Sequence, residues 1–282
     1  MHNGALRKMA LALTLWLALH MSSLKAQIFT NDLPLQAVTT GSNPVDFEFR
    51  SDGTLIAKGN FGVGSLGSGD EGAGTRMLWF PSLGAFRAGG VDGTQWDQDN
   101  IGQYSAAFGY KTTASGYYSM AWGKQTGAFG IFSSASGAYS WAGGFLDLVM
   151  GGWSSANGGH STAIGTWSTA SGYGSVALGG GDTASGSSST VIGNGNTASG
   201  YYATASGRYT TASAYNSFVT GTYNVGGGSS TAWVSTDPLF EIGNGTSSTP
   251  SDALVVYKNG NGILQGTLQI APGGDIPMYT GD

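Results

Sequence analysis

The chain has 282 residues, of which 50 are glycine and only 10% are charged, and its formal net charge is −5. A chain with so few basic residues lacks the positive footprint that nucleic-acid binding requires. It contains no cysteine, which excludes disulfide bonds and a lipid anchor attached through a cysteine.

The N-terminus has the layout of a secretory signal peptide. Arg7 and Lys8 form a short positive region, and the apolar run Met9–Leu19 leads to Ala26 as the residue before cleavage. The run is too short to span a bilayer, which favours a cleaved signal over a membrane anchor. We therefore expect residues 1–26 to be a signal peptide, and the exported mature chain to insert no segment into a membrane.

Residues 27–101 precede the regular part of the sequence and are expected to be a β-rich N-terminal cap. Within them, Val45–Phe49 alternates apolar and acidic residues, and Asp52-Gly53 is a hairpin signal. Arg76–Pro81 and Ala85–Gly89 are further strand candidates. A cap is expected because the open end of a repetitive fold needs to be covered.

From Gly102 to Gly207 a glycine stands at every seventh residue, and the series resumes at Gly221 after a break at Ala214. Two such intervals make one 14-residue unit with two similar halves, which end in Ser-x-Ala-x-Gly and Thr-Ala-Ser-Gly. Nine such units cover residues 102–227. A fixed period of this kind indicates a solenoid, in which each repeat contacts only its neighbours.

Seven is also the period of a coiled coil, but a glycine in every heptad would cost a helix about 1 kcal/mol each. Such a helix would also lack a Leu and Ile seam and its charged flanks. Strands fit better, because side chains alternate between the two faces of a strand. Ala or Val stands two residues before each mid-repeat glycine, and in most units a larger residue stands between it and the glycine. The pattern predicts an all-β parallel coil with two short strands in each 14-residue turn and a glycine at each corner. With turns about 4.8 Å apart, nine turns would make a rod of roughly 40 Å.

The larger residues beside the Ala and Val positions are expected to share one outer face that a single coil cannot cover. A long exposed apolar stripe marks an interaction surface, and closed symmetric homo-oligomers are its usual outcome. The residues of this stripe are Phe108, Trp122, Met150, Ile164, Leu178 and Ile192.

The Ser-x-Ala-x-Gly and Thr-Ala-Ser-Gly unit resembles the head repeat of trimeric autotransporter adhesins, the YadA-like or haemagglutinin-type repeat. The resemblance covers residues 102–227 and implies a left-handed parallel β-roll in an intertwined or side-by-side homotrimer. Unit 144–157 departs most from the pattern, and unit 214–227 is expected to be a capping turn. Because the family's outer-membrane anchor is C-terminal, residues 228–282 are expected to be a β-rich connector, truncated or leading to a stalk or anchor.

Little in the repeats could carry catalysis. Their charged residues are Lys111, Lys124, Asp147, Asp182 and Arg208, which form no pairs suited to acid–base chemistry. Calcium-binding glycine repeats need a nine-residue period with an aspartate in each repeat, and no strand–GxxxxGK[ST]–helix pattern for phosphate is present. We therefore expect no enzyme, no cofactor and no metal site.

Aromatic residues recur at the expected corners of the coil and are the candidate ligand-binding residues. One corner carries Tyr104, Tyr118, Phe132 and Tyr202, and the other carries Tyr139, Trp153, Trp167, Tyr209 and Tyr223. The second series is our candidate platform for sugars or for a proline-rich host protein. The alternative, which stacked coils favour, is a structural ladder whose rings pack turn on turn or fill a subunit interface.

The function that follows is a secreted, surface-displayed adhesin head whose partners are copies of itself and a host matrix protein or glycan. The resemblance places it at the cell surface, in the outer membrane or outside the cell. The alternative is a structural fibre segment that has no receptor site of its own.

Overall fold

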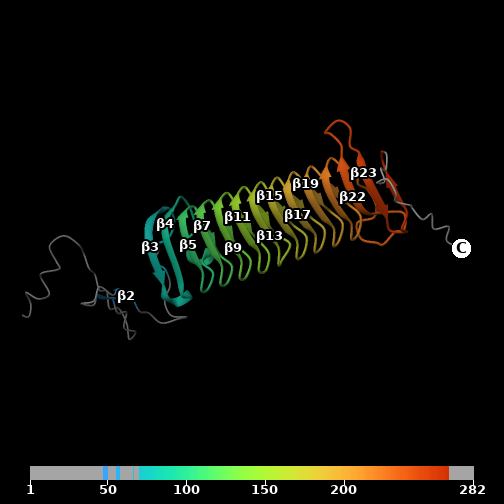
Figure 1. Ribbon diagram of the computed structural model, residues 1–282. Coiled ribbons are helices and arrows are strands. Elements are labelled where there is room, and N and C mark those ends of the chain that lie inside the picture. Colours follow the sequence, from blue (N-terminus) through green and yellow to red (C-terminus); the bar gives the residue numbers. More distant parts are fainter. Residues whose placement is uncertain (1–46, 50–54, 58–65, 67–69, 267–282) are drawn as a thin grey trace, which may run out of the picture. The chain divides into compact units, whose positions relative to one another are not determined.

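The computed structural model describes residues 47–49, 55–57, 66 and 70–266 (Figure 1). The described residues form strands, turns and two short 3-10 helices. β1 (Phe47–Phe49) and β2 (Leu55–Ala57) pair antiparallel, as the Asp52-Gly53 hairpin signal predicts, within a unit separate from residues 60–282. The predicted signal peptide, residues 1–26, lies outside the described residues.

The repeats form a parallel β-solenoid with one long and one short strand in each turn (Figure 1). Each strand pairs with its equivalent in the next 14-residue unit, so that Val149 lies beside Ala163 and Ala163 beside Ala177. The predicted all-β parallel coil with a 14-residue turn is confirmed. The long strands are β5 (Ala106–Tyr110), β7 (Met120–Lys124), β9 (Ser134–Ala138), β11 (Leu148–Gly152), β13 (Thr162–Thr166), β15 (Val176–Gly180), β17 (Thr190–Asn194), β19 (Thr204–Arg208) and β21 (Phe218–Thr222).

The short strands form a second, eight-stranded sheet. They are β6 (Thr113–Ala114), β8 (Gly127–Ala128), β10 (Trp141–Ala142), β12 (Ser155–Ala156), β14 (Thr169–Ala170), β16 (Thr183–Ala184), β18 (Thr197–Ala198) and β20 (Thr211–Ala212). The ninth unit, residues 214–227, forms its long strand β21 but no short strand. The coil therefore has eight complete turns rather than the nine that the glycine count suggests.

Both ends of the large sheet continue into antiparallel strands, which makes it 14-stranded. At the N-terminal end, β3 (Gly74–Phe80) and β4 (Ala85–Val91) form a hairpin around the 3-10 helix η1 (Pro81–Leu83), and β4 pairs parallel to β5. A second 3-10 helix, η2 (Gln98–Asn100), precedes the first turn. At the C-terminal end, β22 (Pro238–Asn244) follows β21, and then β23 (Asp252–Tyr257) and β24 (Gly262–Leu264) reverse direction.

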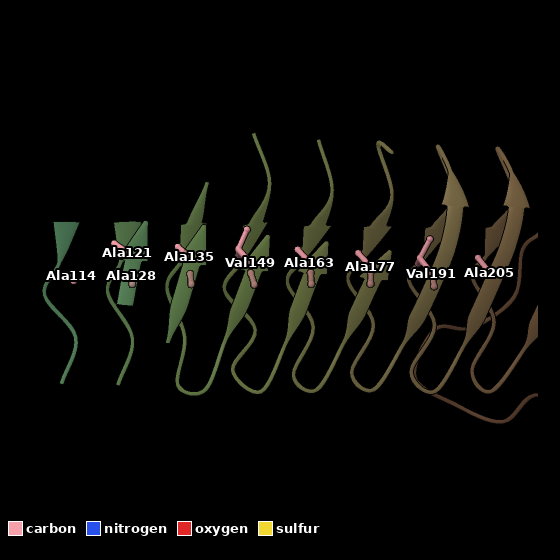
Figure 2. Close-up of a cluster of buried hydrophobic side chains, with 14 of the residues drawn as sticks. Ala114, Ala121, Ala128, Ala135, Val149, Ala163, Ala177, Val191 and Ala205 are labelled. Carbon is pink, nitrogen blue, oxygen red and sulfur yellow. The ribbon is translucent and has the colours of Figure 1, made fainter. Parts of the chain in front are cut away.

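The core between the two sheets is a stack of alanine and valine side chains, one from each strand, lying above one another along the coil (Figure 2). Those of the long strands run from Ala107 to Val219, and those of the short strands from Ala114 to Ala212. Small polar residues precede them on the inside of each corner, where Ser105, Ser161 and their equivalents are buried. The core is thin because nothing larger than valine enters it within the turns.

Two charged residues occupy the ends of the same inward-facing series. Arg87 aligns with Ala107 at the N-terminal end, and Glu241 aligns with Val219 at the C-terminal end. Both are buried. The Arg87 guanidinium donates hydrogen bonds to the backbone oxygens of Ser105 and Ala114, at 3.0 and 2.9 Å. Burial lowers the pKa of Arg87 to about 10, which still leaves it charged at neutral pH.

Side chains also seal the two free edges of the short-strand sheet. Beside β6, the indole of Trp96 donates a hydrogen bond to the Thr112 carbonyl oxygen at 2.8 Å. Beside β20, the Asn224 side chain accepts a hydrogen bond from the Thr211 amide at 2.7 Å and donates one to the Thr211 carbonyl at 3.0 Å. Asn224 thereby pairs with Thr211 as a strand residue would, and it also donates a hydrogen bond to Glu241.

Only every second glycine of the ladder lies at a corner, where it forms a bend, as Gly172 does. The other ladder glycines lie within the long strands, and both kinds mark places where successive turns come closest. Gly165 is the fourth residue of β13 and has φ +131°, and a Cβ there would overlap the backbone carbonyl of Gly179. Its equivalents in the other turns face the same carbonyl in the next turn. At each corner, the residue two positions after the ladder glycine adopts the left-handed conformation.

Gly165→Ala is expected to lower the free energy of unfolding by at least about 3 kcal/mol, because it adds a backbone clash to an unfavourable φ. The matched control is Gly159→Ala, since Gly159 also has a positive φ of +77° but nothing lies within 3.7 Å of its Cβ position. That change should cost about 1 kcal/mol. Urea denaturation of both variants measures the difference, and equal costs would show that turn-to-turn contact does not require the glycine.

Stability should fall as the pH rises from about 4.5 to about 7. Burial raises the pKa of Glu241 to about 7, against the opposing effect of its hydrogen bond from Asn224. In this pH window the folded state therefore retains a proton that the unfolded state releases. Above the window, the free energy of unfolding is lower by about 3 kcal/mol at most. Burial also raises the pKa of Asp252, so this carboxyl too makes stability fall as the pH rises.

The variant Glu241→Gln tests this, because an amide keeps an oxygen to accept from Asn224 and cannot ionise. Urea midpoints at pH 5 and pH 8 should differ less in the variant than in the wild type, mainly through a gain at pH 8. A variant that loses as much stability as the wild type between the two pH values would contradict the assignment.

Candidate binding surface

Large side chains occupy many corners of the coil, where the backbone adopts the left-handed conformation. Among the residues that the structure describes, the fifteen non-glycine residues with positive φ are all corner residues, with φ between 44° and 62°. Bulky residues rarely adopt this conformation, which costs roughly 1–2 kcal/mol per residue. The interactions of the corner side chains must offset that cost.

The structure brings the five candidate residues to one edge of the coil, and we call them the tryptophan column: Tyr139, Trp153, Trp167, Tyr209 and Tyr223. Their rings stack nearly parallel, with centroids 4.9 Å apart for Tyr139 and Trp153 and 5.0 Å apart for Trp153 and Trp167. Tyr209 and Tyr223 stack at 4.9 Å. Stacking gives about 0.5–1.5 kcal/mol per pair beyond burial, which offsets much of the backbone cost.

The column is interrupted where Gly181 and Gly195 occupy the corner. Trp167 is the last ring before the gap and is 61% exposed, against 47% for Trp153, which has a ring on both sides. The Tyr209 ring lies across Gly195, since a Cβ there would run into it. The column is therefore two separate platforms, and Trp167 offers the more open aromatic face.

The opposite corner carries a second series of rings. Tyr104, Tyr118 and Phe132 stack with centroids 5.1 and 4.7 Å apart. The series continues edge-on through Phe145, His160 and Tyr173, with centroids 5.2 to 6.0 Å apart, and Tyr202 contacts Tyr215 at 5.6 Å. At both corners the rings pack turn on turn, as a structural ladder would, and still present exposed faces.

Two cations lie over rings of the tryptophan column. The Lys124 ammonium is 5.3 Å from the Tyr139 ring centroid, and the Arg208 guanidinium is 5.3 Å from that of Tyr209. Each platform thus has a cation–π contact at its first ring, from the preceding turn at Tyr139 and from the neighbouring residue at Tyr209. The charge makes these ends suitable for polar or anionic groups of a ligand.

The outer side of the large sheet is apolar, and we call it the apolar face. Its exposed large residues include Met120, Trp122, Met150, Ile164, Ile192 and Phe218. Aromatic rings extend the apolar face toward both ends of the sheet. The ring centroids of Phe86 and Phe108 are 5.5 Å apart, and those of Phe218 and Phe240 are 5.7 Å apart. The apolar stripe predicted from the sequence is thus present, although Ser136 and Ser206 occupy its position in two of the turns.

The outer side of the short-strand sheet is different, because it carries threonine and serine hydroxyls in most turns. The exception is the N-terminal end, where a pocket of about 250 Å³ opens beside β6, β8 and β10. This pocket was not predicted, and its only trace in the sequence is that residues 127–129 and 141–143 depart from the Thr-Ala-Ser pattern. The pocket is lined by Asp92, Gln95, Lys111, Thr113, Gln125, Thr126, Gly127, Phe129 and Trp141.

Titratable groups are scattered over the part of the chain that the structure describes. Within it, no three His, Asp or Glu side chains gather as a metal site would require. Lys111 forms an ion pair with Asp92, and their hydrogen bond lowers the pKa of the Asp92 carboxyl and raises that of the lysine. Burial raises the pKa of Asp182, whose carboxylate accepts a hydrogen bond from the Asn196 amide at 2.8 Å inside the coil. Among the same residues, no helix is long and apolar enough to cross a membrane.

A family model of the YadA head domain repeat, two copies long, matches residues 101–126, 150–181, 184–210 and 198–224. No curated protein matches the sequence. Residues 101–126, 150–181 and 184–224 are therefore similar to YadA head repeats, the repeating unit of an adhesin-type head domain. A repetitive head on a β-solenoid is non-enzymatic in kind.

Proposed function

Because segments within residues 101–224 match the YadA head repeat, we propose that this protein is exported and displayed on the cell surface as the head of a homotrimeric adhesin. It attaches the cell to host matrix, host cells or neighbouring bacteria. The observation that carries this proposal is the combination of two kinds of exposed surface on one coil: the apolar face on the large sheet and the aromatic columns at its corners.

The apolar face supports self-association. Its exposed apolar side chains form a patch larger than a monomer usually leaves in water, and it contains few groups that a polar ligand could bind. They occupy the same strand position in most turns, so copies of the same coil can match one another along their length. Closed symmetry would bury the stripe of every copy at once. The short-strand sheet and its pocket then remain outside.

The aromatic columns support attachment. Rigid rings give a large contact area at low entropic cost, and exposed faces such as that of Trp167 suit sugar rings or proline-rich chains. Each copy would repeat the same weak site, so that three copies raise the effective concentration and make attachment firm.

Ile164→Asp with Leu178→Asp is expected to prevent trimer formation, because charges in the centre of an apolar interface are costly to bury. Light scattering should give the mass of three chains for the wild type and of one chain for the variant, with β-sheet circular dichroism retained. The matched control is Thr169→Asp with Thr183→Asp, in the same part of the coil but on the short-strand sheet, which should remain a trimer. A wild-type protein that is monomeric, folded and soluble would overturn the proposed assembly.

Trp153→Gln with Trp167→Gln is expected to weaken binding to the glycans or matrix proteins that the wild type captures on an array. Glutamine is suitable because Gln125 occupies the same corner position with φ 51°. The loss of stacking should reduce stability by about 1 kcal/mol per ring pair, so the thermal midpoint should fall only slightly.

Tyr118→Gln with Phe132→Gln removes two stacked rings from the opposite corner and serves as the control. If both variants lose stability alike and neither loses binding, the tryptophan column is a structural ladder. If the intact trimer captures no glycan or matrix protein at all, the protein is a structural fibre segment instead of an adhesin.

A further inference from the structure

The pocket on the short-strand sheet lies where the repeat is interrupted. In most other turns the outward residues of the short strand and its end are threonine and serine, but here they are Gly127 and Phe129 in one turn and Trp141 in the next. The absence of a side chain at Gly127 makes room for the two rings, since a Cβ there would lie 2.9 Å from Trp141 Cδ1 and still closer to the Phe129 ring.

The shape of the pocket suits one ring-sized ligand. Its volume of about 250 Å³ is below the range of roughly 300–1,000 Å³ that is usual for drug-sized ligands. Phe129 and Trp141 are 46% and 44% exposed, so both offer aromatic surface to a ligand. Aromatic side chains combined with a few polar groups are the usual lining of a small-molecule site.

The remaining wall supplies groups that both donate and accept hydrogen bonds. Gln95 and Gln125 contribute carboxamides, and Thr113 contributes a hydroxyl. Gln95 uses its nitrogen to donate to Asp92 at 3.0 Å. A polyhydroxyl ligand offers matching donors and acceptors to these groups.

Charge in the pocket is balanced. Asp92 and Lys111 pair with each other across its rim, so neither is free to select an ion of opposite charge. A neutral ligand can accept from the ammonium and donate to the carboxylate without disrupting the pair. The lining therefore favours an uncharged polyhydroxyl ring over a sialic or uronic acid.

We propose that this pocket binds a single neutral pyranose ring at the end of a glycan chain, with its apolar face against Trp141 and its hydroxyls on the two glutamines. The inference rests on the proposed adhesive function and gives it a site distinct from the tryptophan column. The pocket opens on the sheet opposite to the apolar face, so that it stays accessible when copies of the chain associate.

The test is saturation-transfer NMR of the full-length protein with the methyl glycosides of glucose, galactose and mannose, and with sialic acid, glucuronic acid and a proline-rich peptide. At least one neutral glycoside should bind, with millimolar affinity. Trp141→Ser, which introduces the residue that Ser155 places at this position one turn later, should weaken binding at least tenfold. Gln95→Ala lies before the coil and tests the same site with little risk to folding.

Trp167→Gln, in the tryptophan column, is the matched control and should change the affinity less than twofold. The pocket proposal is overturned if no neutral glycoside binds, if only the acidic sugars or the peptide bind, or if Trp167→Gln alone abolishes binding. These outcomes are distinguishable from failure of the adhesive function, in which the intact protein would also capture nothing on glycan and matrix arrays.

Discussion

The spacing between successive turns is the constraint on which the rest of the structure depends. Parallel backbone hydrogen bonds hold neighbouring strands about 4.8 Å apart, and every position of the 14-residue unit therefore meets its own equivalent at that distance. Where the backbone carbonyl of the next turn approaches, as at Gly165, only glycine fits. At the corners the same spacing equals the separation of stacked rings, which is why centroid distances cluster between 4.7 and 5.1 Å.

The small core has consequences for the outer surface of the coil. A core of alanine and valine buries little apolar surface per residue, so much of the stability has to come from backbone hydrogen bonds and from contacts between equivalent side chains. The larger apolar residues are placed outside, on the large sheet, where only another molecule can cover them. Under the proposed assembly, association through the large sheet would leave the short-strand sheet and the corners free.

The period, the parallel pairing, the alanine and valine core and the apolar face were all predictable, because each follows from residues that recur at a fixed spacing. The function of the strand glycines was not predictable. Gly165 combines a positive φ inside a strand with a close carbonyl of the next turn, and nothing in the sequence distinguishes it from a glycine at a corner. The missing short strand of the ninth unit could not be foreseen from glycine positions alone, since Gly221 is retained while Asn224 takes the place of a strand residue. The candidate column could be placed correctly because its rings share the 14-residue period. The pocket could not be predicted in this way, because Asp92 and Gln95 come from the non-repetitive segment before the first turn.

The sealed edges of the short-strand sheet have a consequence for the evolution of the molecule. Trp96 and Arg87 close one edge and Asn224 the other, so that no further chain can add a strand there and lengthen the coil. Between these stops, each turn pairs in the same way with the turn before and the turn after it. Unequal recombination within the gene could therefore insert or delete whole 14-residue cassettes without disturbing either terminus. The length of the coil can thus vary among descendants while the specialised ends are inherited unchanged.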